Sequence, residues 1–143
     1  MPPTLRQAVP GDAAALAALA GELGYPAEPD EFERRLVSLS PEDDVWVATI
    51  DGEMVGWVHC SVCRSLVVEP HLVILGIIVG DKWRQQGIGR ELMAAAERSA
   101  SERGVSAIRL RSGSQRDEAH AFYRAVGYRE QKTQLVFVRE VDR

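Results

Sequence analysis

The stretch LGIIVGDKWRQQGIGR, residues 75–90, predicts an apolar strand that passes through a short basic glycine turn into a long helix. Gly87 and Gly89 carry no Cβ, so the backbone of this turn can adopt unusual dihedral angles and approach a ligand closely. The first amides of the following helix lack intrahelical partners, and the helix dipole is positive at that end. Arg84 and Arg90 add full charges. The stretch therefore predicts a cradle for a phosphate group.

The turn departs from two common nucleotide-binding patterns. A Walker loop needs Gly-Lys followed by Ser or Thr, and the sequence has no such triplet. A dinucleotide fingerprint needs a third glycine where this chain has Leu92, and 143 residues are few for two mononucleotide-binding halves. A nicotinamide or flavin cofactor is therefore the weaker alternative.

A second strand and helix follow the first unit. Residues 107–111 form an apolar and basic run that predicts a strand, and residues 119–128 predict a helix that ends at a glycine. The helix joining the two strands makes this a parallel crossover, which is expected to be right-handed.

These two segments together resemble the GCN5-related N-acetyltransferase (GNAT) family. RQQGIG at residues 84–89 matches the family's Arg/Gln-x-x-Gly-x-Gly/Ala signature, which binds the pyrophosphate of acetyl-coenzyme A. A second signature, Ala-x-x-x-Tyr-x-x-x-Gly-Phe/Tyr, is matched by Ala119, Tyr123, Gly127 and Tyr128. The resemblance extends over residues 73–128, with the two motifs in the family's order and at about its separation.

The resemblance implies an α/β fold of the GNAT acyl-CoA N-acyltransferase type. Its central, mostly antiparallel twisted sheet should contain one splayed parallel strand pair and be flanked by about four helices. A chain of 143 residues with 45% hydrophobic content suits a single domain over residues 1–143.

Local patterns give the expected order of elements. Helices are predicted after Asp12, after Asp30, at 89–103 and at 119–128. Strands are predicted at residues 4–9, 45–50, 53–62, 73–79, 107–111, 128–131 and 133–141. Asp51-Gly52 predicts a tight hairpin between the second and third strands.

The resemblance implies acetyl-coenzyme A as cosubstrate. The residues expected to contact its pyrophosphate are Arg84, Gln85, Gln86, Gly87, Ile88, Gly89 and Arg90. Its pantetheine arm is expected along the backbone of Ile77, Ile78 and Val79, and further cofactor contacts are expected from Ala119 and Arg116. Arg116 stands where many relatives have asparagine, and it either reaches a phosphate or remains a solvated charge.

The resemblance also implies direct attack of an amine on the thioester. Tyr123 matches the family's general acid, which would protonate the departing thiolate. The alternative role for Tyr123 is an aromatic side chain on the buried side of a helix, beside Phe122. A backbone amide near Val79 is the candidate donor to the oxygen on which negative charge develops.

The sequence does not assign the general base that would deprotonate the amine. Many relatives carry a glutamate in the strand that precedes the glycine turn, whereas residues 73–79 contain no carboxylate. Glu69 or His71 at the entrance of that strand, or a water molecule, are the alternatives.

Cys60 and Cys63 form a C-x-x-C pair that would suit a redox couple, or a zinc site completed by His59 and His71. The surrounding strand pattern favours small buried hydrophobes with sulfurs on opposite faces. The sequence therefore predicts no metal.

The acceptor is expected to be a small cationic amine, because the net charge is −4 and Glu22, Glu28, Asp30 and Glu31 cluster around the first helices. A protein N-terminus or lysine is the alternative acceptor, and a non-catalytic acyl-CoA-sensing module is the alternative function. Nucleic acid and membrane partners are not expected, and location is expected to be cytoplasmic. A homodimer through the C-terminal strands is compatible with the apolar residues 135–138.

Overall fold

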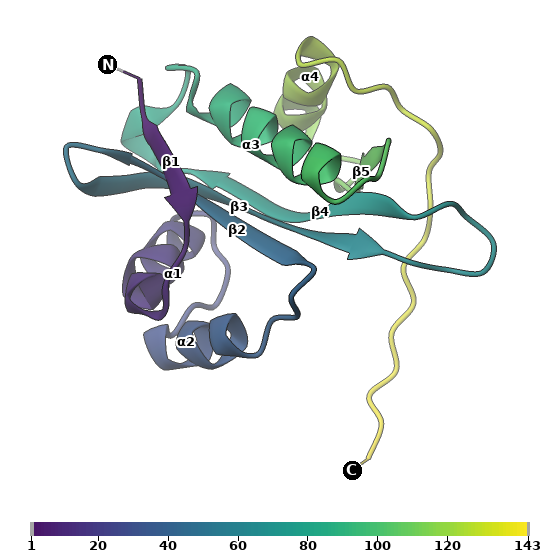
Figure 1. Cartoon of the computed structure of the whole chain (residues 1–143), viewed down its shortest axis with the longest axis horizontal. Coiled ribbons are helices and arrows are strands. Elements are labelled where there is room, and N and C mark those ends of the chain that lie inside the picture. Colours follow the sequence, from purple (N-terminus) through teal and green to yellow (C-terminus); the bar gives the residue numbers. More distant parts are fainter. Residues whose placement is uncertain (1, 143) are drawn as a thin grey trace. The chain divides into compact units, whose positions relative to one another are not determined.

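The computed structural model of the chain describes residues 2–142 (Figure 1). The chain divides into two compact units, the first ending at Arg111 and the second beginning at Ser112. None of the described helices combines the length and apolar character needed to cross a lipid bilayer.

The first unit alternates strands and helices. Its strands are β1 (Thr4–Gln7), β2 (Asp43–Ile50), β3 (Glu53–Cys63), β4 (His71–Val79) and β5 (Ile108–Leu110). Its helices are α1 (Ala13–Glu22), α2 (Pro29–Val37) and α3 (Ile88–Glu102), with short 3₁₀ turns at Pro10–Asp12 and Asp81–Trp83. The second unit contains α4 (Asp117–Ala125).

The five strands form one mixed sheet in the order β1-β2-β3-β4-β5. The first three pairings are antiparallel, and β4 pairs with β5 in parallel. Asp51 and Gly52, which join β2 to β3, both have positive φ, of 50° and 81°. Two such residues are what a type I′ hairpin turn requires. The mixed sheet with a single parallel pair confirms the predicted α/β class.

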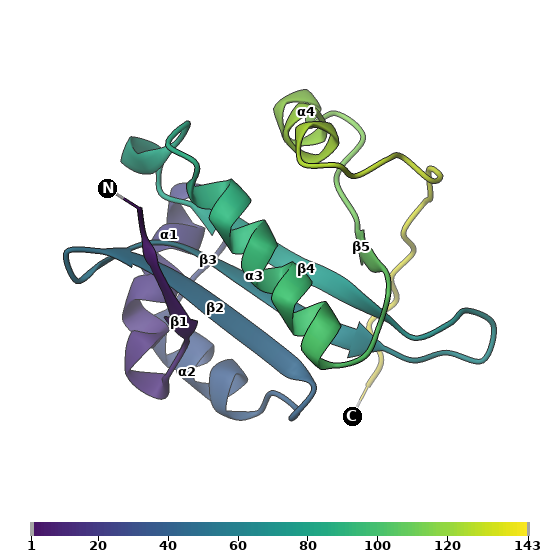
Figure 2. The ribbon, with the colours of Figure 1, turned by 45° about the horizontal axis from the view of Figure 1, so that its top comes forward.

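Helices cover both faces of the sheet. In Figure 2, α1 and α2 lie on one face and α3 on the other. Leu16 of α1 packs on Val45 and Val47 of β2, and the Trp57 indole N–H donates to the Leu16 carbonyl oxygen at 3.2 Å. The apolar positions of the strands therefore form two cores, one on each face.

Gly56 of β3 allows α3 to pack closely on the other face. A Cβ at this position would lie 2.8 Å from the Ile78 carbonyl oxygen, 3.1 Å from the Leu92 side chain and 3.3 Å from that of Ile88. Ile88 and Leu92 are 2% and 0% exposed. The first turn of α3 is therefore anchored to the centre of the sheet.

The predicted strands at residues 128–131 and 133–141 are wrong. Residues 128–142 have no regular secondary structure, and Leu135, Val136, Phe137 and Val138 are between 81% and 87% exposed. The β-branched and aromatic residues supply strand propensity, but a strand also needs a neighbour that pairs with its backbone groups. A dimer through C-terminal strands therefore has no strand to use in this structure.

Cys60 behaves as a buried hydrophobe. Its side chain is fully buried, and Cys63 is only partly buried; both are free thiols. Burial raises the pKa of the Cys60 thiol to about 11. The thiol is therefore protonated at neutral pH and a poor nucleophile.

A polar network joins the end of α3 to the start of β2. Arg103 donates from Nε and Nη2 to the two carboxylate oxygens of Asp44, both at 2.9 Å, and Gln7 of β1 donates to the same carboxylate at 3.2 Å. The Asp44 and Arg103 side chains are 13% and 25% exposed. Burial alone would raise the pKa of Asp44, but hydrogen bonds from Arg103 and Ser99 outweigh it and lower the pKa below its ordinary 3.8. The ionised carboxylate therefore stabilises the fold.

We expect Asp44→Asn to lower the free energy of unfolding at pH 7 by about 1–3 kcal/mol, because it leaves Arg103 without its ionic partner. A carboxyl with a depressed pKa stabilises fully above its unfolded pKa and loses that contribution as pH falls through its folded pKa. The difference between Asp44→Asn and the natural protein should therefore shrink below about pH 4. Urea unfolding at pH 7 and at pH 3 measures both differences.

The exposed Glu33→Gln serves as the control, with an expected change within about 0.5 kcal/mol. A difference for Asp44→Asn that stays constant down to pH 3 would contradict a role for the ionised carboxylate.

Candidate active site

The turn between β4 and α3 presents open backbone amides. Gly87 caps α3 with a left-handed φ of 83°, a conformation that favours glycine, and no side chain caps this helix end. The first intrahelical hydrogen bond runs from the Glu91 amide to the Gly87 carbonyl at 3.1 Å. The amides of residues 88–90 therefore point out of the helix, where its dipole is positive.

The charged side chains of this turn already have ionic partners. Arg84 lies 3.2 Å from Asp81, and Lys82 lies 3.2 Å from Glu53. The structure brings the predicted phosphate-contacting residues 84–90 together in one exposed turn, except that the Ile88 side chain enters the core and only its backbone faces outward.

A bulge in β4 ends the pairing with β5. The β3 partners of Ile74 and Gly76 are consecutive residues, Cys60 and His59, so Leu75 is an extra residue with no partner on β3. Leu75 is 59% exposed. The parallel ladder covers residues 72–74 of β4 and stops at the bulge, so none of the described strands pairs with the outer edge of residues 75–79.

Backbone groups on this open edge alternate. The Gly80 amide donates to the Val55 carbonyl at 2.9 Å and so faces β3. Because successive residues of a strand point their backbone groups to opposite sides, Ile78 also faces β3, whereas Ile77 and Val79 face the open edge. The Ile78 side chain is 5% exposed, against α1. Of the three residues predicted to hold a pantetheine arm, Ile77 and Val79 thus have backbone groups available.

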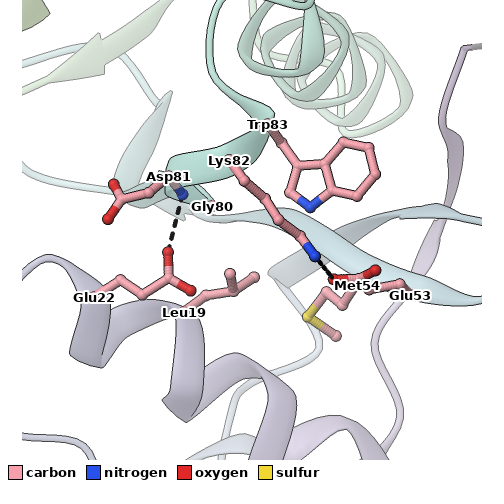
Figure 3. Close-up of a pocket in the computed structure, with 8 residues that line it drawn as sticks. All are labelled: Leu19, Glu22, Glu53, Met54, Gly80, Asp81, Lys82 and Trp83. Atoms are coloured by element: carbon pink, nitrogen blue, oxygen red, sulfur yellow. Dashed lines mark hydrogen bonds and ion pairs between the residues drawn. The ribbon is translucent and has the colours of Figure 1, made fainter.

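A pocket of about 240 Å³ lies where β4 ends. It is lined from α1, from the start of β3 and from the turn after β4 (Figure 3). The lining residues are Leu19, Glu22, Glu53, Met54, Gly80, Asp81, Lys82 and Trp83. Antiparallel pairing of Gly56 with Val79 places the start of β3 beside the end of β4.

Three carboxylates line this pocket. Glu22 Oε1 accepts a hydrogen bond from the Asp81 amide at 2.9 Å, which ties α1 to the turn. Glu53 is paired with Lys82, and the Lys82 ammonium lies 5.5 Å from the centroid of the Trp83 ring. The Trp83 indole nitrogen is buried and has no hydrogen-bond acceptor among the described residues.

Glu69 and His71, the predicted alternatives for the base, lie at the opposite end of β4. The His71 ring nitrogen Nδ1 lies 3.0 Å from the Glu69 carbonyl oxygen, and His71 is 8% exposed. Val79 lies eight positions beyond His71, a distance of about 26 Å along a strand. The structure therefore does not bring either residue to the glycine turn.

The remaining predicted residues lie in the second unit. Arg116 precedes α4 as its N-cap, and Ala119 and Tyr123 lie within the helix. The Tyr123 ring packs edge-on against Phe122, with centroids 5.4 Å apart, and lies 6.4 Å from the Tyr128 ring. Ala119 and Tyr123 therefore lie in one helix, as the sequence predicted, and Arg116 lies at its N-terminal boundary.

Sequence reasoning missed Glu53 and Asp81 as site residues. Glu53 follows the Asp51-Gly52 turn, and Asp81 follows an apolar strand. Antiparallel pairing of two consecutive strands brings the start of one beside the end of the next. That topology was the available signal, and it would have placed both acids at one end of the sheet.

The chain matches the sequence profile of the Acetyltransferase (GNAT) family over residues 14–128. It is 33% identical to an aminoglycoside N(6')-acetyltransferase type 1 of Stenotrophomonas maltophilia, over 94% of this chain and 92% of that protein. It is also 33% identical to an aminoalkylphosphonate N-acetyltransferase of Salmonella typhimurium, over 78% of this chain and 72% of that protein.

A solved structure has the same fold. AAC(6')-Iy, in complex with the bisubstrate analog CoA-S-monomethyl-acetylneamine, superposes with a TM-score of 0.82 at 19% identity, covering 96% of this chain and 97% of that one. The mixed sheet, the open turn before α3 and the matched profile agree, and this chain therefore belongs to the GNAT acetyltransferase family and is an N-acetyltransferase.

Proposed function

We propose that the protein transfers the acetyl group of acetyl-coenzyme A directly to a small cationic amine, with both substrates bound together. One observation carries the proposal: the open edge of β4 leads into the open N-terminus of α3. A cosubstrate with a polar arm and a pyrophosphate matches both features, because the arm can hydrogen-bond to the strand edge and the pyrophosphate to the helix N-terminus.

The pyrophosphate lies on the amides of residues 88–90, with Arg84, Gln85, Gln86 and Arg90 around it. The pantetheine arm lies along β4, where Val79 exchanges backbone hydrogen bonds with its amides and the thioester end reaches Ile77. Arg116 and Ala119 of α4 add contacts to the same cosubstrate. Support comes from the family, which uses acetyl-coenzyme A, and from the backbone groups available on the β4 edge.

The reaction begins with an uncharged amine that attacks the thioester carbonyl carbon. The Ile77 amide, which faces the same open edge as Val79 and lies farther from the turn, stabilises the oxygen on which negative charge develops. The carbon–sulfur bond then breaks, and Tyr123 protonates the departing thiolate. A water molecule removes the proton from the amine, because β4 carries no carboxylate and Glu69 and His71 lie at its other end.

A cationic acceptor is favoured by the carboxylates of the pocket and by the net charge of −4. The two curated relatives are named for an aminoglycoside and an aminoalkylphosphonate, which are small molecules that carry amines. A pocket of about 240 Å³ suits such an acceptor better than a protein N-terminus or lysine.

The proposal extends to organisation and location. Residues 1–143 act as a single N-acetyltransferase domain, because the family match over residues 14–128 crosses the boundary between the two compact units. Two free cysteines in a C-x-x-C spacing favour the reducing cytoplasm. The exposed apolar residues 135–138 favour a homodimer that buries these side chains without strand pairing.

The decisive experiment measures release of free coenzyme A thiol from acetyl-coenzyme A with aminoglycosides, polyamines, amino acids and lysine peptides as acceptors. We expect release with small polycationic amines and none with lysine peptides. Tight coenzyme A binding without release for any acceptor would favour a sensing module, for which the absence of a β4 carboxylate is the supporting observation.

We expect Tyr123→Phe to reduce kcat about a hundredfold, because the thiolate loses its proton donor. The dissociation constant for coenzyme A should change by less than about twofold, since the phenol acts on the leaving group rather than on binding. Tyr128→Phe is the matched control, because it removes a neighbouring hydroxyl at a position where the family signature accepts phenylalanine. Equal kcat in the two variants would remove Tyr123 from the mechanism.

We expect Gly87→Asp to weaken coenzyme A binding at least about tenfold, as measured by calorimetry. The substitution strains a residue with φ of 83° and places a negative charge beside the phosphate cradle. Gly104→Asp imposes comparable strain, with φ of 72°, and the same charge beyond the opposite end of α3. Normal affinity in Gly87→Asp, or equal loss in both variants, would contradict the cradle.

A further inference from the structure

A cationic group of the chain itself already occupies the pocket at the end of β4. The Lys82 ammonium lies 3.2 Å from a Glu53 carboxylate oxygen and 5.5 Å from the centroid of the Trp83 ring, and Figure 3 shows the Lys82 side chain extending to Glu53. Carboxylates and aromatic faces both bind ammonium groups in proteins. Lys82 therefore marks a place built for an ammonium group.

This internal ion pair is easily exchanged. The Lys82 and Glu53 side chains are 70% and 53% exposed. Exposed pairs of this kind shift an equilibrium by only about two- to fivefold, so another ammonium can replace Lys82 at small cost. Release of a flexible lysine side chain also returns conformational entropy that the pair had consumed.

Trp83 offers a second contact in the same pocket. Its buried indole N–H has no acceptor among the described residues. An ammonium has no lone pair and cannot satisfy this donor, whereas a hydroxyl oxygen can. A ligand that satisfies both Glu53 and Trp83 carries an ammonium and a hydroxyl near each other.

We propose that Glu53 and Trp83 form a subsite for the non-reacting end of the acceptor, which carries a second ammonium group and a neighbouring hydroxyl. Lys82 occupies the ammonium position when no acceptor is bound and competes with it. The acceptor is thus an amino alcohol with at least two amines, one acetylated and one held by Glu53. This assignment rests on the proposed function, because it concerns the acceptor of that reaction.

Lys82 has a competing assignment as a ligand of the coenzyme phosphate. The geometry favours the acceptor side, because the ammonium points to Glu53 of β3 in the acidic pocket. Arg84, not Lys82, is the paired cation nearer in sequence to the open α3 amides. The two assignments predict different effects of removing Lys82. If Lys82 competes with the acceptor, acceptor binding becomes stronger. If Lys82 binds the coenzyme phosphate, coenzyme A binding becomes weaker.

The test uses three four-carbon amines, butylamine, putrescine and hydroxyputrescine, in calorimetry with the full chain saturated with coenzyme A. We expect Lys82→Met to lower the dissociation constant of putrescine about two- to fivefold, and Glu53→Gln to raise it by a similar factor. Trp83→Phe should remove the advantage of hydroxyputrescine over putrescine, about two- to tenfold for one hydrogen bond.

Lys132→Met is the matched control. It removes the only other lysine, which is exposed, and changes the net charge by the same amount. Any general effect of charge on polyamine attraction appears equally in both lysine variants. The effect specific to the subsite is measured as the ratio of the dissociation constants of putrescine and butylamine. This ratio should change more in Lys82→Met than in Lys132→Met.

Three results would overturn the subsite: equal behaviour of the two lysine variants, weaker coenzyme A binding in Lys82→Met, or no binding of any of the three amines. Measuring release of free coenzyme A thiol distinguishes an error in the subsite from an error in the proposed acetyl transfer. Release without differences among the variants overturns the subsite alone, and variant-dependent binding without release overturns the proposed acetyl transfer.

Discussion

Close packing of α3 on β3 at Gly56 is the constraint on which the candidate active site depends. The Ile78 carbonyl oxygen and the Leu92 side chain leave no room for a Cβ there. Glycine lets the first turn of α3 bury Ile88 against the sheet, directly after the turn that leaves β4. The helix amides are thereby held in a fixed position, as a preorganised anion site requires.

Four charged side chains around this turn neutralise one another in two ion pairs. Arg84 is paired with Asp81, and Lys82 with Glu53, so neither sign dominates the surface. A ligand that binds any of these four side chains takes over one member of an existing pair. Because all four side chains are well exposed, that exchange costs little. The arrangement suits a protein that binds an anionic and a cationic substrate side by side.

Much of this organisation was predictable from the sequence. The Asp51-Gly52 turn and the helix predicted at 89–103 have clear local signals, and the structure places α3 at Ile88–Glu102. The bulge at Leu75 was not predictable, because an apolar residue in an apolar strand gives no sign of losing its partner. The strand predicted at 133–141 failed because propensity does not supply a neighbouring strand. The ion pair of Glu53 with Lys82, in the turn after β4, depends on the pairing of β3 with β4, which local sequence patterns do not encode.

The open edge of β4 also affects how the protein behaves in solution. An unpaired strand edge is a template on which another chain can add a strand. Residues 75–79 form such an edge, with no partner strand in the described part of the chain. In the proposed binding mode, the cosubstrate lies along this edge, takes the place of a neighbouring strand and blocks that addition. Colloidal stability is then coupled to the supply of the cosubstrate, and the empty enzyme is the form most exposed to self-association.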